Sequence, residues 1–193
     1  MRMAGLRVIA GEAKGRKLRM VSGAGTRPIT DRVKESLFSI LAGDVPGSQF
    51  LDLFAGTGSV GIEALSRGAA RATFVESSAR ALTTLRTNLE LTRLADRGHV
   101  VQADVFRFLT GTPDTPFDIV YVAPPQYADL WLRTVRLVDS NPGWLTEGGV
   151  LIAQMHPKEW TPPKLQRLRV EDDRSYGSTR LIFFGVGSAE QGA

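Results

Sequence analysis

The stretch FLDLFAGTGSVG, residues 50–61, joins a short apolar run to a glycine-rich turn and then to a segment of helical character. Asp52 lies in the apolar run, and Gly56, Thr57 and Gly58 follow in the turn. Glycine allows a positive φ and a close approach of the backbone to a ligand, and the start of a helix presents free N–H groups. The stretch therefore predicts a strand, a ligand-binding turn and a helix.

Beyond this stretch, apolar runs of strand length alternate with segments of helix length. The expected strands are 72–76, 99–104, 118–123 and 149–155, and the expected helices are 59–67, 78–94 and 127–139. These runs are too continuously apolar for a sheet that is covered on one face only. The pattern predicts an α/β fold: a doubly wound, mostly parallel, seven-stranded Rossmann-like sheet with helices on both faces.

The end of the chain has a different pattern. Two further strand candidates, 165–173 and 179–186, are joined by the turn-like segment 174–178. Such a short connection favours an antiparallel hairpin at one end of the sheet. Residues 187–193 are small and polar, and we expect a disordered tail there.

The start of the chain is also distinct from the alternating part. Residues 6–20 suggest a glycine-punctuated pair of short strands, and 30–41 suggest an amphipathic helix with Thr30 as its N-cap. We expect a basic N-terminal β extension over residues 1–29, ahead of a main domain over 30–186.

Charge is distributed unevenly along the chain. The 193 residues carry a net charge of +4, yet residues 1–36 hold nine Lys/Arg against three Asp/Glu, so this part is +6 and the rest is −2. A solvated surface would explain the excess, and so would a face that contacts phosphates. There is no cysteine and no long apolar run, so we expect a cytoplasmic protein without disulfides, a membrane span or a metal site.

Acidic side chains stand at the ends of the next two expected strands. Glu76 lies 24 positions after Asp52, where a carboxylate can accept both hydroxyls of a ribose. Asp104 is followed by Val105 and Phe106, which suits an adenine amine and its ring. Ligands of open α/β sheets bind beyond the carboxyl ends of the strands, so the sequence predicts a nucleotide-like ligand there.

The glycine spacing leaves two further interpretations open. Gly56, Gly58 and Gly61 also satisfy G-x-G-x-x-G, which is typical of nicotinamide dinucleotide sites, and a tight turn needs no ligand at all. The fourth strand ends in VYVAPPQY, residues 120–127, where two prolines make a rigid turn that a dinucleotide site does not explain.

Together these features resemble the S-adenosylmethionine-dependent methyltransferases that modify exocyclic amines. The resemblance rests on Asp52 ahead of Gly56-x-Gly58, on Glu76 and Asp104, and on the two prolines and tyrosine after the fourth strand. The stretches RVIAGEAKGRKL, RPITDRVKESLFSIL, LDLFAGTGSVGIEALSRGA and DRSYGSTRLIFF extend it to the bacterial 16S ribosomal RNA guanine-N2 methyltransferases. It covers nearly the whole chain.

The resemblance implies a role for particular residues. Those implied to bind S-adenosylmethionine are Asp52, Phe54, Gly56, Thr57, Gly58, Glu76, Ser77, Asp104 and Val105, with Thr30 and Arg32 near the cofactor and the target base. Those implied to contact RNA are Arg7, Lys14, Arg16, Lys17 and Arg27, and those implied at the methyl-transfer site are Ala123, Pro124, Pro125 and Tyr127. The implied partner is 16S ribosomal RNA in a partly or fully assembled small subunit, and we expect a monomer or a weak homodimer.

The turn after the fourth strand departs from the family at two positions. The fourth-strand turn usually reads Asp or Asn followed by Pro-Pro-Phe or Pro-Pro-Tyr, whereas here Ala123 precedes the prolines and Gln126 follows them. We expect the backbone carbonyls of Ala123 and Pro124 to accept the amine hydrogens, and Tyr127 to stack on an extruded base. The alternatives are another RNA target, an inactive RNA-binding protein of ribosome assembly, and a nicotinamide-dependent oxidoreductase.

Overall fold

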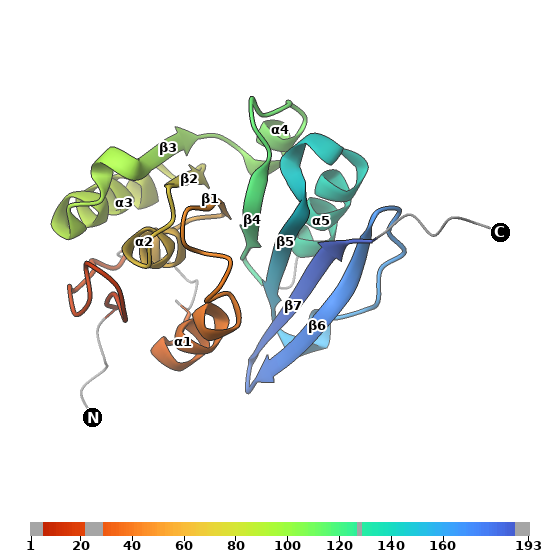
Figure 1. The fold of residues 1–193 in the computed structure, drawn as a ribbon, viewed down its shortest axis with the longest axis horizontal. Helices are drawn as coiled ribbons and strands as arrows, with labels where there is room; N and C mark the ends of the chain where they lie inside the picture. Colours follow the sequence, from red (N-terminus) through yellow and green to blue (C-terminus); the bar gives the residue numbers. More distant parts are fainter. Residues whose placement is uncertain (1–5, 22–28, 127–128, 188–193) are drawn as a thin grey trace.

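The computed structural model describes residues 6–21, 29–126 and 129–187. At its centre is a seven-stranded sheet with the order β3-β2-β1-β4-β5-β7-β6 (Figure 1). The strands are β1 (Gln49–Leu53), β2 (Arg71–Glu76), β3 (Gly98–Gln102), β4 (Phe117–Val122), β5 (Leu145–Met155), β6 (Leu168–Tyr176) and β7 (Thr179–Val186). The neighbouring pairs from β3 to β5 are parallel, and β7 is antiparallel to both β5 and β6. The predicted α/β class and the C-terminal hairpin are confirmed.

Helices cover both faces of the sheet. They are α1 (Asp31–Ile40), α2 (Ser59–Ser66), α3 (Ala79–Thr92), α4 (Val105–Leu109) and α5 (Leu130–Ser140), with short 3-10 turns at Ala95–Arg97, Pro142–Trp144 and Pro157–Glu159. Side chains of β4 alternate between two cores: Ile119 and Tyr121 pack with α1, α2 and α3, and Val120 and Val122 pack with α4 and α5. None of the described helices is long and apolar enough to cross a membrane.

Helix α4 was not expected from the sequence. Asp104 accepts a hydrogen bond from the Arg107 backbone N–H at 2.9 Å and so caps this short helix. Helix α5 begins at Leu130 rather than at 127, and β5 begins at Leu145 rather than at 149. These differences shift the edges of elements and leave the topology unchanged.

The basic N-terminal segment (residues 6–21) is less regular than a pair of strands. Its antiparallel pairing is limited to one bridge, between Arg7 and Lys17, within the described residues. Gly11 has φ +80°, and a Cβ there would lie 1.8 Å from the Ser66 carbonyl oxygen, so only glycine permits this contact with α2. Leu6 and Val8 are buried in the same core as the apolar side chains of α1 and α2.

The expected C-terminal tail, 187–193, lies outside the described residues except for Gly187. The Gly187 backbone N–H donates to the Arg167 carbonyl at 2.8 Å. The division at residue 29 remains a prediction.

Candidate functional site

A cavity of about 130 Å³ opens at the carboxyl ends of β1 and β4. Its walls come from three parts of the chain: the basic N-terminal segment and Ile29, the turn from β1 into α2, and the ends of β4 and β5. Five of the residues predicted to bind cofactor or substrate line it, namely Asp52, Phe54, Gly56, Thr57 and Ala123. The sheet therefore brings together residues that are up to 71 positions apart in the sequence.

The turn after β1 has a backbone that suits close approach of a ligand. Phe54, Gly56 and Gly58 all have positive φ, at +62°, +54° and +75°. A Cβ on Gly58 would lie 2.1 Å from a methyl carbon of Leu85, so helix packing requires this glycine. A Cβ on Gly56 would meet only the Phe54 carbonyl oxygen, at 4.0 Å, so the space beside Gly56 is open. That this turn holds the amino-acid portion of S-adenosylmethionine stays a prediction.

Asp52 is buried beneath this turn. Its Oδ2 accepts a hydrogen bond from the Gly61 backbone N–H at 2.9 Å, at the start of α2. Burial raises the pKa of Asp52 to about 8, against the opposing effect of the Gly61 hydrogen bond. Gly61 is needed for packing, because a Cβ there would lie 2.3 Å from the Phe74 ring.

Glu76 ends β2 next to the same turn. Its carboxylate accepts hydrogen bonds from the Gly56 N–H at 2.9 Å and from the Ser78 N–H at 2.8 Å. A carboxylate has about four acceptor positions, so two remain for ribose hydroxyls. Ser77 lies between Glu76 and Ser78 in sequence and is exposed. The predicted role of Glu76 fits this geometry.

The residues predicted to hold adenine lie outside the lining of this cavity. The Val105 side chain is buried in the core under α4, so only its backbone can face a ligand. Phe106 connects the two regions, because its ring lies 6.1 Å from the Phe54 ring in an edge-to-face arrangement. The Arg133 guanidinium lies over the Phe106 ring, 3.7 Å from its centroid.

The turn after β4 lies at the carboxyl end of this central strand. The Ala123 N–H donates to the Leu53 carbonyl at 3.4 Å, and Pro124 and Pro125 then leave the ladder, half-buried and exposed respectively. Tyr127, predicted to stack on the base, lies outside the described residues.

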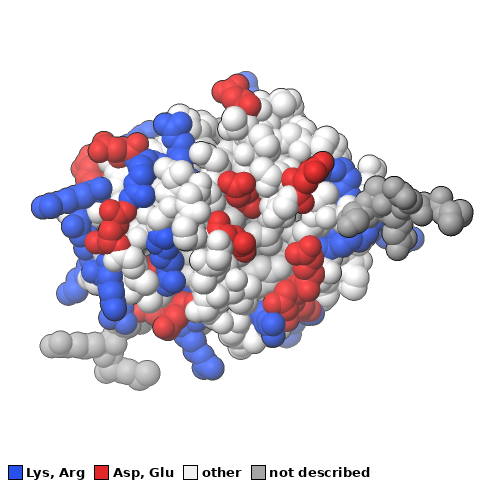
Figure 2. All heavy atoms as spheres, in the orientation of Figure 1, with Lys and Arg blue, Asp and Glu red and all other residues white. Residues whose placement is uncertain are grey.

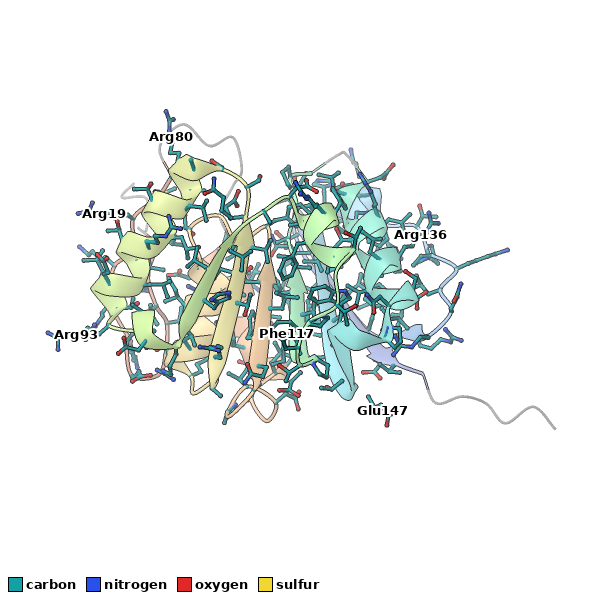
Figure 3. All side chains as sticks on the ribbon, turned by 90° about the horizontal axis from the view of Figure 1, so that it is seen from above. Arg19, Arg80, Arg93, Phe117, Arg136 and Glu147 are labelled. Carbon is teal, nitrogen blue, oxygen red and sulfur yellow. The ribbon has the colours of Figure 1, made fainter. Side chains whose placement is uncertain are left out.

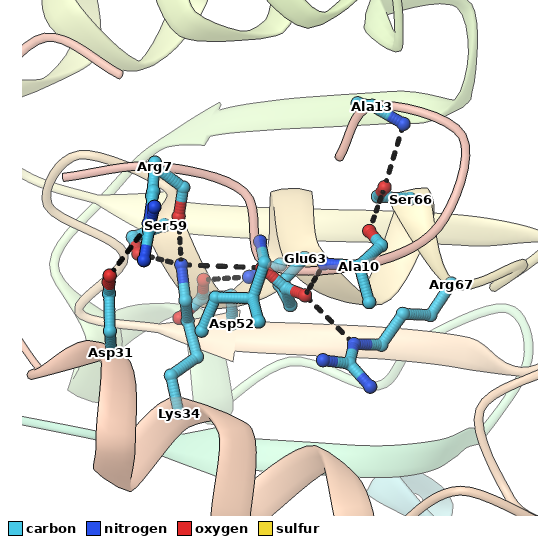
Figure 4. A network of polar contacts seen from close by, with 12 residues as sticks. Arg7, Ala10, Ala13, Asp31, Lys34, Asp52, Ser59, Glu63, Ser66 and Arg67 are labelled. Atoms are coloured by element: carbon cyan, nitrogen blue, oxygen red, sulfur yellow. Dashed lines mark hydrogen bonds and ion pairs between the residues drawn. The ribbon is translucent and has the colours of Figure 1, made fainter. Parts of the chain in front are cut away.

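A buried ionic network lies beside the cavity and was not predicted (Figure 4). Lys34 donates to the Arg7 carbonyl at 2.6 Å and to the Ser59 hydroxyl at 3.2 Å, and its Nζ lies 3.3 Å from Glu63 Oε2. Burial lowers the pKa of Lys34, against the opposing effect of Glu63. Because Ser59 lines the cavity, the network connects the cavity wall to the basic N-terminal segment.

Asn88 on α3 makes a second unpredicted connection. Its Oδ1 accepts from the Arg19 N–H at 2.7 Å, and its Nδ2 donates to the Arg19 carbonyl at 3.1 Å and the Thr57 carbonyl at 2.9 Å. One side chain thus fixes the basic N-terminal segment against the glycine turn.

The residues predicted to contact RNA differ in their surroundings. Lys14 and Lys17 are exposed, whereas Arg7 pairs with Asp31 at 2.9 Å and Arg16 donates to the Leu91 carbonyl at 3.0 Å. Arg27 lies outside the described residues. Thr30 caps α1 as predicted, accepting from the Val33 N–H at 3.4 Å, and Arg32 in the same helix is exposed.

Helix α3 adds arginines that the sequence analysis did not consider. Arg86 is exposed on α3, and Arg93 is exposed directly after it. Figure 3 shows Arg19, Arg80 and Arg93 on one side of the molecule and Arg136 on the opposite side. In Figure 2, Lys and Arg gather where Figure 1 places α3 and the basic N-terminal segment, with acidic side chains among them. Within the described residues, no three His, Asp or Glu side chains are grouped as metal ligands.

The strand order with its antiparallel β7, and the glycine turn beside Glu76, are features of the Rossmann-like methyltransferases that use S-adenosylmethionine. A family profile then matches residues 6–185, under the description "Conserved hypothetical protein 95". The chain belongs to this family.

Its relatives include proteins named for ribosomal RNA methylation. Ribosomal RNA small subunit methyltransferase D of Escherichia coli (strain K12) is 39% identical over 157 residues, covering 81% of this chain and 78% of that protein. YlbH of Bacillus subtilis (strain 168) is 34% identical over 181 residues, covering 93% and 98%. The solved structure of yhhF from Escherichia coli matches with a TM-score of 0.82 and 34% identity, covering 93% and 97%. These likenesses favour a methyltransferase over the nicotinamide-dependent oxidoreductase.

Proposed function

We propose that this protein transfers a methyl group from S-adenosylmethionine to the exocyclic N2 amine of a guanine in small-subunit ribosomal RNA. One observation carries the proposal: Met20 and Val21, at the end of the basic N-terminal segment, line the same cavity as Asp52 and Ala123. RNA held by the basic segment would therefore lie next to the bound cofactor. The E. coli relative's name, a small-subunit ribosomal RNA methyltransferase, supports this choice of RNA.

When bound, S-adenosylmethionine supplies a methyl group on a sulfonium that an amine nitrogen can attack in line. The protein contributes mainly positioning, which can lower a barrier by about 7–11 kcal/mol. Losing the side-chain acceptor at position 123 raises the barrier by about 1.5–3 kcal/mol. The barrier lowering from positioning is larger than this loss. In this mechanism the carbonyls of Ala123 and Pro124 accept the amine hydrogens, the N2 proton passes to water, and Tyr127 stacks on the extruded base.

The role of the proline turn can be tested on its own. Pro124→Ala frees the backbone next to the acceptor carbonyl, so we expect kcat to fall about tenfold while the affinity for S-adenosylmethionine stays unchanged. Pro162→Ala, in an exposed loop, is the control and should have native kcat. An unchanged kcat in Pro124→Ala would remove the turn from the mechanism.

The proposal extends to the partner and the setting of the reaction. Its substrate is 16S ribosomal RNA in a partly or fully assembled small subunit, and the protein acts in the cytoplasm as a monomer or weak homodimer. A second candidate is an inactive RNA-binding protein of ribosome assembly, which the alanine at position 123 specifically favours because an acceptor is missing there.

Mapping of ribosomal RNA separates these candidates. We expect one N2-methylguanosine to disappear from 16S RNA in cells that lack the protein, by mass spectrometry of RNA fragments. The native gene should restore it, and a Glu76→Ala variant should not. A full set of methylated guanines in the deletion cells would contradict the proposal, and an assembly defect without a lost methyl group would favour the second candidate.

A further inference from the structure

Two polar side chains lie in the cavity next to Ala123 and have no part in the mechanism above. Tyr121 on β4 and Gln154 on β5 both line it, together with Asp52 and Ala123. The Tyr121 hydroxyl donates to the Gln154 Oε1 at 2.5 Å. Tyr121 is buried, at 2% exposure, and Gln154 is half-buried.

The strand register brings Gln154 beside the alanine. Val122 pairs with Ala153 across the parallel strands β4 and β5, so Ala123 and Gln154 are the next residues along each strand. Tyr121 and Ala123 point to the same face because side chains alternate along a strand, and the hydrogen bond from Tyr121 shows that Gln154 points there too. Neighbouring strands are about 4.8 Å apart. The side chain of Gln154 is therefore long enough to bring its amide to the place that an Asp or Asn side chain at position 123 would occupy.

Tyr121 also determines which amide atom of Gln154 is held in place. Burial, together with the nearby Asp52 carboxyl, raises the pKa of Tyr121 well above its usual value. The neutral hydroxyl donates its proton to the Gln154 oxygen, and this hydrogen bond orients the amide with its oxygen toward Tyr121. An amide oxygen has two lone pairs, and this bond uses one of them.

We propose that Gln154 is the side-chain acceptor for the target amine, in place of the Asp or Asn that Ala123 replaces. The inference rests on the proposed function and names a residue for it. The second lone pair of Gln154 Oε1 accepts one N2 hydrogen in place of one of the two backbone carbonyls. The methyl group bonds to nitrogen as the carbon–sulfur bond breaks, and the other N2 hydrogen, held by the remaining carbonyl, passes as a proton to water. The short side chain of Ala123 leaves the space between Gln154 and the base free.

The test measures methyl transfer to undermodified small subunits and, separately, the affinity for S-adenosylmethionine. Gln154→Leu keeps the volume and removes the acceptor, so we expect kcat to fall about ten- to a hundredfold with the cofactor affinity unchanged. Adding Ala123→Asp to Gln154→Leu restores an acceptor and should recover kcat to within a few fold of the native value. Gln166→Leu, in a separate groove beside α5, is the matched control and should behave as the native chain does.

Each outcome decides the matter. Native kcat in Gln154→Leu overturns the inference, and so does a loss that Ala123→Asp fails to restore in a folded, cofactor-binding double variant, since that loss would be structural. If Gln154→Leu does not fold, Tyr121→Phe, which removes the hydroxyl that orients the amide, takes its place under the same criteria. If the native chain methylates no RNA, the proposed function itself fails and the inference fails with it.

Discussion

The Lys34 ammonium lies 3.3 Å from the Glu63 carboxylate, and both side chains are fully buried. Glu63 also accepts hydrogen bonds from the backbone N–H groups of Ile9 and Ala10, at 2.8 and 3.0 Å. The pair therefore joins α1 and α2 to the basic N-terminal segment. Because that segment forms a wall of the cavity, the ion pair links the fold to the proposed RNA site.

Breaking this pair should destabilise the protein strongly. Lys34→Met removes the ammonium from the buried Glu63 carboxylate, which keeps its ion pair with Arg67 at 2.8 Å. We therefore expect the free energy of unfolding in urea denaturation to fall by about 3 kcal/mol, the lower end of the range for a broken buried pair. Arg7→Ala is the control, because its ion pair with Asp31 is exposed and should contribute less than about 1 kcal/mol. If both substitutions lowered the free energy of unfolding equally, the buried ion pair would contribute no more to stability than the exposed one.

Asp52 should make stability depend on pH. Its pKa of about 8 in the folded state lies above the usual 3.8, so the folded state retains a proton that the unfolded state releases. The stabilisation is complete below the unfolded pKa and is lost as pH rises, by up to about 1.4 kcal/mol per pH unit, until pH passes the folded pKa. Asp52→Asn should remove this slope.

The measurement is the free energy of unfolding of both proteins between pH 5 and pH 8, a window of about three units. The value for Asp52→Asn minus that for the native chain should grow with pH. Asp114→Asn, in an exposed loop, should run parallel to the native curve. A parallel curve for Asp52→Asn would show that Asp52 ionises normally.

Glu76 should determine cofactor affinity. Its removal takes away the acceptor for the Gly56 and Ser78 N–H groups and the proposed ribose contacts, so Glu76→Ala should weaken S-adenosylmethionine binding about ten- to a hundredfold in calorimetry. Glu90→Ala, exposed on α3, is the control and should bind normally. Native affinity in Glu76→Ala, or tighter binding of NAD than of S-adenosylmethionine by the native chain, would contradict the assignment of this site.

The arginines of α3 should contribute to RNA binding. Arg86→Ala combined with Arg93→Ala should weaken binding to all RNA sequences alike and reduce the slope of log affinity against log salt by about 2. Arg136→Ala combined with Lys164→Ala removes the same charge from the groove beside α5 and should leave the slope unchanged. Equal slopes for both double variants would place the RNA elsewhere.

Local patterns were enough to predict much of this molecule. The apolar runs predicted the strands of the sheet, the threonine before an amphipathic stretch predicted the N-cap of α1, and Gly56 and Gly58 predicted the turn. Each of these features depends on residues that are close in sequence. The position of Glu76 at the end of a strand was predicted in the same way, and its role in binding the cofactor stays a prediction.

Contacts between distant residues had no such signal. Asn88 reaches Arg19 across 69 positions, and Gln154 meets Tyr121 across 33, so neither partner is visible in the sequence around the other. In the sequence, Lys34 is one of nine Lys/Arg among residues 1–36 and has no distinguishing feature. Only the packing of α1 on α2 buries it against Glu63. Helix α4 has five residues, too few for a helical period to stand out.

The most direct test of the central claim is methyl transfer by the purified protein. Small subunits from cells that lack the protein are incubated with S-adenosylmethionine that carries a deuterated methyl group, and the 16S RNA is digested to nucleosides for mass spectrometry. We predict that the label appears as N2-methylguanosine at about one per subunit with the native chain, and is lost with Glu76→Ala. Label in another nucleoside, or no transfer by a chain that binds S-adenosylmethionine, would contradict the account.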